Sequence, residues 1–273
     1  MNSLRAFWAT AKRELLIRCR YADWFVAMLL WPILMPVFTV FAAQALAGPD
    51  NSGGQIFSEI AGTSDYVGFV FIGVVMWNWL NTVLWQVGST LRTEQRRGTL
   101  EPNWVTPASR LAIMSGSGLT SMVSSLMTVT ISLIFCKLAW GIDLTFSPFL
   151  GLIFLLSTAS IYGLGLIFAS LVLLVKELNS AVNVVRGIFM VFCGITYPIS
   201  VMPHWMQTVA KALPLTYSID LIRQVGLAGA TYANVSGAFW TLFAFAASLL
   251  AAGCLLFIVM DRIVARKGTL GQY

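Results

Sequence analysis

The stretch that decides the fold is residues 66–91, YVGFVFIGVVMWNWLNTVLWQVGSTL. It contains no Asp, Glu, Lys or Arg, and it exceeds the roughly 20 residues that a helix needs to cross the hydrocarbon core of a bilayer. Its amide and hydroxyl side chains recur at helical spacing, so they fall on one side of such a helix. The stretch therefore predicts a transmembrane helix with one polar side.

The whole chain shares this apolar character. Of its 273 residues, 58% are hydrophobic and 10% are charged, whereas about 25% of an average soluble domain is charged. This composition excludes a soluble globular enzyme, a disordered chain and a disulfide-bonded scaffold. Apolar runs occupy most of the chain and leave no room for a separate soluble domain. The sequence therefore predicts an all-α integral membrane protein with one domain over residues 1–273.

Six apolar runs are long enough to be membrane spans. They cover Asp23–Leu46, Tyr66–Leu91, Leu111–Trp140, Pro148–Val175, Ala181–Ser200 and Ser236–Met260. The third and fourth runs also carry small residues, among them Gly163 and Gly165, which allow helices to pack closely.

The basic residues indicate how these spans are oriented. Those of the first and second cytoplasmic regions are Arg5, Lys12, Arg13, Arg18, Arg20, Arg92, Arg96, Arg97 and Arg110. The connection Ala47–Asp65 carries no Lys or Arg. The positive-inside rule therefore predicts that both termini are cytoplasmic, in a cell membrane that we expect to be a bacterial inner membrane. Because the basic residues flank spans and form no single patch, the net charge of +6 does not indicate nucleic-acid binding.

The first 22 residues have an amphipathic pattern. Leu4, Trp8, Ala11 and Leu15 recur at helical spacing, and the basic residues lie off that line. The pattern predicts a basic helix at the inner membrane surface, in contact with lipid. The alternative is a positively charged flank without fixed helical structure.

The segment 197–235 is neither a plain loop nor a clean span. Pro198, Pro203 and Pro214 divide it into short pieces that remain apolar. We expect short helices that re-enter the outer leaflet and form a lid. Asp220 and Arg223 are three residues apart and could form an ion pair on one helix face.

Catalytic constellations are missing from the sequence. His204 is the only histidine, so neither a His-rich metal site nor a Ser-His-Asp triad is available. The chain also lacks a Gly-x-x-x-x-Gly-Lys-Ser/Thr phosphate-binding loop. We therefore expect no enzyme, and no metal or cofactor bound by this chain.

Two spans carry polar side chains that mark a candidate site. The second supplies Asn78, Asn81, Thr82, Trp85 and Gln86, and the fifth supplies Asn183 and Arg186. Amides are costly in hydrocarbon, so the stripe should face protein or water. Two interpretations remain open: these residues line a transport path, or they form hydrogen bonds between helices of the bundle.

Local motifs and the order of elements resemble a known family. The motifs are Glu94, Gly98-Thr99-Leu100-Glu101 and Thr106-Pro107 after the second span, and Pro198, Met202-Pro203, Trp205, Leu213-Pro214, Tyr217 and Arg223 in the outer region. With the N-terminal basic helix and six spans, this order resembles ABC-2-type permeases, the membrane subunits of ABC exporters. Pro102 departs from the family pattern, and because proline is tolerated in a first helical turn, it shifts the expected start of the following helix.

The resemblance implies a permease subunit of an ATP-driven exporter that works by alternating access. Two permease copies, as a homodimer, would bind two ABC ATPase subunits, and ATP and Mg would be held there. The loop 92–110 would contain the coupling helix, with Glu94, Gly98, Thr99, Leu100 and Glu101 at the ATPase contact. The cargo would be a small amphipathic molecule, a lipid or a glycan. The alternative is an ion- or proton-coupled secondary transporter, which usually has internal repeats and charged residues at mid-membrane.

Overall fold

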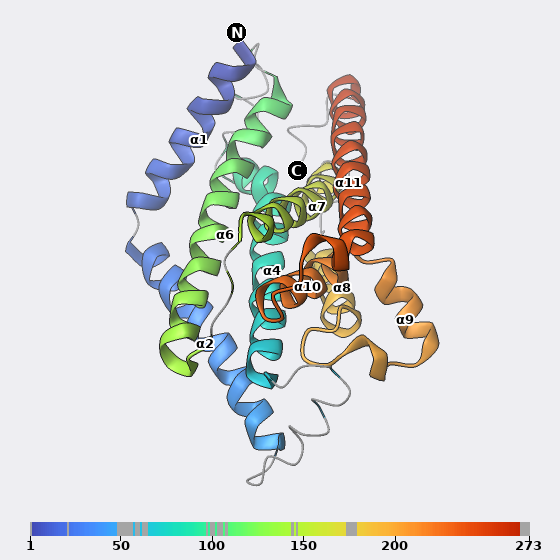
Figure 1. Ribbon diagram of the computed structural model, residues 1–273. Coiled ribbons are helices and arrows are strands. Elements are labelled where there is room, and N and C mark those ends of the chain that lie inside the picture. Colours follow the sequence, from blue (N-terminus) through green and yellow to red (C-terminus); the bar gives the residue numbers. More distant parts are fainter. Residues whose placement is uncertain are drawn as a thin grey trace.

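The computed structural model describes residues 2–20, 22–47, 57, 61, 65–96, 98, 102, 106, 109–142, 145, 147–172 and 179–267. Within these ranges every regular element is a helix (Figure 1). The all-helical fold predicted from the apolar runs is therefore confirmed for the described part of the chain.

The helices follow the predicted runs, with differences at their ends. They are α1 (Asn2–Arg20), α2 (Ala22–Ala47), α4 (Tyr66–Arg96), α6 (Arg110–Trp140), α7 (Pro148–Val172), α8 (Asn179–Phe192), the short 3-10 helix η1 (Ile199–Val201), α9 (His204–Lys211), α10 (Pro214–Gly226) and α11 (Tyr232–Lys267). Helix α4 continues beyond Leu91 to Arg96, so the predicted loop 92–110 begins as helix.

Among the residues that the structure describes, four helices are long and apolar enough to cross a membrane. Their spans are Tyr66–Val87, Arg110–Trp140, Pro148–Leu171 and Tyr232–Ile263. Two shorter apolar stretches, Leu30–Ala42 and Val182–Phe192, lie in α2 and α8. The topology of six spans therefore stays a prediction.

Helix α4 is the centre of the bundle. It packs against α2, α6, α7, α8 and α10 (Figure 1). Trp79, Leu80, Val83 and Leu84 are fully buried along it, and the Trp79 indole donates a hydrogen bond to Ser125 Oγ of α6 at 3.2 Å. The helix with the predicted polar stripe is thus held from several sides, which fixes the direction in which each stripe residue points.

Helices α7 and α11 make close contact through glycines. A Cβ at Gly163 would lie 2.5 Å from the backbone carbon of Leu249, and a Cβ at Gly253 would lie 2.6 Å from the carbonyl oxygen of Gly163. A side chain at either position would push the helices apart. The prediction that small residues in the fourth span serve packing is confirmed here.

The N-terminal helix α1 runs beside the upper part of α6 (Figure 1). Ala11 is buried against α6, where its carbonyl accepts a hydrogen bond from Thr120 Oγ1 at 3.4 Å. Leu4, Trp8 and Leu15 are exposed. The amphipathic stripe therefore divides between one small residue that packs and three large residues that face outward. Its contact with a membrane surface stays a prediction.

The fifth predicted span, Ala181–Ser200, is wrong at its outer end. Helix α8 has 14 residues and ends at Phe192, shorter than the roughly 20 residues that cross a bilayer core. Gly194 follows with a φ of 66°, a left-handed conformation that ends helices and favours glycine. The chain then turns before Pro198.

The outer segment is divided by its prolines as predicted. Pro198 precedes η1, Pro203 precedes α9, and Pro214 is the first residue of α10. Each proline supplies a fixed φ at a helix start, where its missing N–H costs nothing. Re-entry of these helices into the membrane stays a prediction.

The predicted ion pair between Asp220 and Arg223 is wrong. Arg223 turns inward and donates to the carbonyl oxygens of Phe69 at 2.8 Å, Gly194 at 2.8 Å and Ile195 at 2.7 Å. Asp220 instead accepts from Gln224 Nε2 at 2.8 Å. The exposed carboxylate can be hydrated, whereas the carbonyls at this junction need a donor. Arg223 thereby joins α10 to the start of α4 and to the turn after α8.

This junction has room only for glycine at position 73. A Cβ there would overlap the carbonyl oxygen of Ile195 and lie 2.6 Å from Arg223 Nη2. We expect Gly73→Ala to cost about 1–3 kcal/mol through overpacking and to lower the thermal unfolding midpoint in detergent by about 5 °C. Gly237→Ala is the control because nothing lies within 4 Å of its Cβ position. Equal midpoints for the two variants would contradict the junction.

Candidate functional site

The polar stripe of α4 contains residues of very different exposure. Asn78 and Asn81 are buried, Thr82 and Gln86 are partly buried, and Trp85 is 43% exposed. The stripe residues do not share one partner: Asn81 and Trp85 contact Arg186 of α8, whereas Gln86 contacts Arg18 of α1.

Arg186 of α8 contacts three of the predicted site residues. Its Nε donates to Asn81 Oδ1, and its Nη1 donates to Asn183 Oδ1 at 3.0 Å. Its guanidinium carbon lies 5.7 Å from the centre of the Trp85 ring, within the range of a cation–π interaction. Four residues predicted from two separate spans therefore come together. We call Asn81, Trp85, Asn183 and Arg186 the α4–α8 cluster.

The cluster lies within the apolar stretches of α4 and α8, with Trp85 near the end of the first and Asn183 near the start of the second. Asn81 belongs to the apolar span Tyr66–Val87, and Arg186 belongs to the apolar stretch Val182–Phe192. A charged residue in such a position is costly and marks a functional site by default.

Gln86 faces a second arginine, Arg18 of α1. Arg18 Nη2 donates to Gln86 Oε1 at 3.2 Å and to Ser121 Oγ at 3.3 Å, and its Nη1 donates to Ser124 Oγ. Burial lowers the pKa of Arg18 from its usual value. The sequence does not predict this contact, because the pattern of basic residues indicates only the orientation of the chain.

Asn78 and Thr82 complete the stripe. Thr82 Oγ1 donates to the Asn78 carbonyl oxygen at 2.9 Å, within its own helix. The buried Asn78 Nδ2 has no hydrogen-bond partner in the part of the chain that the structure describes. An unsatisfied buried donor is costly, so Asn78 is a candidate to contact a bound molecule.

Glu94 lies at the end of α4 that the sequence predicts to be cytoplasmic. It is 4% exposed and pairs with Arg13 of α1 through both Nη atoms. Arg13 Nη2 also donates to Glu14 Oε1 at 2.8 Å. Gly98 is exposed with a φ of 68°. Thr99, Leu100 and Glu101, the other residues predicted for ATPase coupling, lie outside the described residues.

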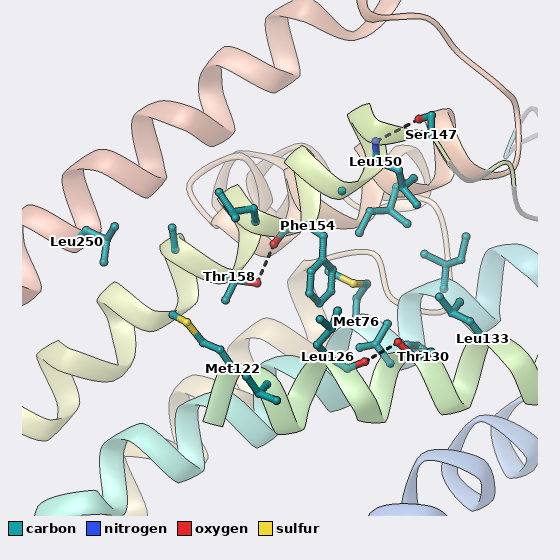
Figure 2. Close-up of a pocket in the computed structure, with 18 residues that line it drawn as sticks. Met76, Met122, Leu126, Thr130, Leu133, Ser147, Leu150, Phe154, Thr158 and Leu250 are labelled. Carbon is teal, nitrogen blue, oxygen red and sulfur yellow. Dashed lines mark hydrogen bonds between the residues drawn. The ribbon is translucent and has the colours of Figure 1, made fainter. Parts of the chain in front are cut away.

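A separate apolar groove opens between α6 and α7 (Figure 2). It encloses about 670 Å³, and Ile72, Val75 and Met76 of α4 line it. Its threonines are bonded to their own helices, Thr130 to Leu126 at 2.8 Å and Thr158 to Phe154 at 2.8 Å. The groove suits an apolar chain, and it contains none of the predicted path residues.

Among the residues that the structure describes, no group of three or more His, Cys, Asp or Glu side chains could hold a metal ion. Long apolar helices packed around a central helix are the architecture of a membrane protein. The comparison with known families makes this class specific. The chain belongs to the ABC-2 type transporter family, whose sequence model matches residues 5–227. The resemblance found in the sequence is confirmed.

Two curated relatives match the chain as well. Each is named "Probable multidrug ABC transporter permease YbhR", one from Escherichia coli K12 and one from Escherichia coli O157:H7. Each is 24% identical over 205 residues, which are 73% of this chain and 55% of the relative. The chain thus spans about half the length of these relatives. Family membership and the apolar helices together identify a multi-pass membrane protein.

Proposed function

We propose that this chain is the membrane-spanning permease subunit of an ATP-driven ABC exporter. It moves a small amphipathic molecule, a lipid or a glycan outward by alternating access. The observation that carries this proposal is the α4–α8 cluster: a charge and two amides inside apolar helix, in a chain of the ABC-2 type transporter family. The name of the relatives supports a drug-like amphipathic cargo.

A separate ATPase supplies the energy. The sequence has no phosphate-binding loop, and the family name places the chain among ABC transporters. ATP and Mg are held by the two ATPase subunits. The ATPase subunits dock at the segment that contains Gly98–Glu101. The Glu94–Arg13 pair transmits the movement of these subunits to α1 and α4.

The transport path runs between two copies of the chain. On α8, Val184, Gly187, Ile188 and Val191 recur at helical spacing, and all four are exposed in the single chain. Nothing lies within 4 Å of a Cβ at Gly187, so a second helix can approach closely there. This face adjoins the α4–α8 cluster, so a homodimer formed here has one cluster on each side of its path.

Transport by the assembled complex tests the proposal. The permease is co-expressed with an ABC ATPase from the same genome, and efflux of a fluorescent amphipathic dye is followed in inverted vesicles. We expect uptake into these vesicles to require ATP and an intact Walker lysine in the ATPase. Uptake that persists without ATP would overturn the exporter assignment.

A secondary transporter is the second candidate, because Arg186 places a charge inside apolar helix. A protonophore separates the two. It abolishes uptake by a proton-coupled transporter at constant ATP, whereas an ABC exporter continues to work.

The topology of six spans with both termini cytoplasmic gives its own prediction. In a chain whose native cysteines are replaced by alanine, Ser58→Cys should react with a membrane-impermeant maleimide on intact cells. Gln272→Cys should react only after the cells are opened. Labelling of Gln272→Cys from outside would contradict the topology.

A further inference from the structure

The α4–α8 cluster holds a positive charge whose described partners are all neutral. Arg186 donates to the amide oxygens of Asn81 and Asn183 and lies over the Trp85 ring. Ion pairs of described residues include Arg13–Glu14, Arg13–Glu94 and Arg110–Asp261, and none of these three involves a residue of the cluster. A charge inside apolar helix without a carboxylate partner attracts an anion.

The hydrogen bonds of the cluster decide what it can offer to a ligand. Each amide oxygen already accepts one hydrogen bond from Arg186, and the N–H groups of Asn81 and Asn183 are further donors. The guanidinium has further N–H groups beyond the two that bond these oxygens. One turn away on α4, Asn78 Nδ2 is a buried donor without a described partner. The cluster thus presents donors, a positive charge and one flat aromatic ring.

The cluster is also open to a ligand. Asn183 is exposed, and Trp85 is 43% exposed, in the single chain. Arg186, which contacts both residues, is partly exposed. A two-fold dimer at α8 would place two such clusters on one path, doubling the positive charge that a cargo meets.

We propose that this cluster selects amphipathic anions. A carboxylate, phosphate or sulfate head binds Arg186 with the amide N–H groups, and the apolar body of the molecule lies on Trp85. Charge-assisted hydrogen bonds to an anion are stronger than neutral ones, and a planar guanidinium matches the oxygens of such a head. A cation would meet the like charge of Arg186. This inference rests on the proposed exporter function, since it names the cargo of the same site.

The test uses the permease–ATPase complex in phosphatidylcholine proteoliposomes. The probes are dodecanoate, dodecyl phosphate, dodecylammonium and uncharged dodecyl maltoside, and the readout is the concentration that half-maximally stimulates ATP hydrolysis. We expect the two anions to act at concentrations about tenfold lower than dodecylammonium. Arg186→Gln should remove this preference, and Arg186→Lys should retain part of it. Lys211→Gln is the control, because it removes an exposed charge outside the cluster.

The outcomes separate the two levels of the proposal. If all four probes stimulate equally and Arg186→Gln changes none of them, the exporter stands and the anion selectivity is wrong. If no probe stimulates hydrolysis in wild type, the proposed function itself fails.

Replacing part of the phosphatidylcholine with phosphatidylglycerol identifies the source of the anion. Competition with dodecanoate indicates a lipid headgroup, and unchanged stimulation indicates a free amphipathic acid. If Arg186→Gln yields no folded complex, a charge preference that is absent from both wild type and Arg186→Lys overturns the inference.

Discussion

Replacing Arg13 by glutamine should lower ATP-driven transport at least about tenfold, because it removes a cationic partner of the buried Glu94 carboxylate. Glu94 is 4% exposed at the end of α4, and Arg13 contacts it through both Nη atoms. Breaking a buried ion pair by removing one partner costs about 3–5 kcal/mol. Arg13 is itself partly exposed, so the lower figure applies. We expect the cost to appear as a separation of α1 from α4.

The charge-reversed pair gives this prediction its sharpest form. Arg13→Glu should be worse than Arg13→Gln, since it places like charges together. The double variant Arg13→Glu with Glu94→Arg should recover a substantial part of transport. Arg5→Gln is the matched control, because Arg5 is an exposed arginine on the same helix. Full transport by Arg13→Gln would show that the pair is not part of coupling.

The apolar runs predicted most of the helices because length and hydropathy are local properties. The ends of α6 and the start of α7 match their predicted runs almost residue for residue. The end of α8 does not, because the run of apolar residues continues to Ile199 while the backbone turns at Gly194. Hydropathy indicates whether a residue tolerates lipid, but it does not indicate whether the backbone is still helical at that residue.

The sequence likewise predicted some features of the candidate site and not others. Helical spacing predicted which side of α4 carries the amides, and it placed Asn183 with Arg186 on the fifth span. It did not predict that Arg18 reaches Gln86, 68 residues away, and Ser124, 106 residues away. The only local signal was the pair of serines, Ser121 and Ser124, on one face of α6. The Asp220–Arg223 pair failed for a related reason: three distant carbonyls, invisible to local spacing, bind Arg223.

We expect Trp85→Ala to lower transport while leaving the protein folded. Trp85 is 43% exposed, so truncating it removes less packing within one chain than truncating the fully buried Trp79 would. Trp85→Ala does remove the aromatic surface beside Arg186 and, by proposal, the surface on which the cargo lies. We expect substrate-stimulated ATP hydrolysis by the assembled complex to fall about tenfold. Asn81→Ala and Asn183→Ala should do the same, because each removes a group that positions the Arg186 guanidinium.

The apolar groove between α6 and α7 supplies the matched comparison. Phe154→Ala enlarges the groove, and Thr158→Val removes a hydroxyl that bonds its own helix. If the path follows the polar stripe, both groove variants should keep their stimulation per folded complex, while Trp85→Ala loses it. If Phe154→Ala loses stimulation and Trp85→Ala keeps it, the cargo follows the groove and the stripe serves helix packing. A fall in folded yield for Asn81→Ala, with stimulation per folded complex intact, would place that amide in packing as well, since a path residue must change transport in the protein that does fold.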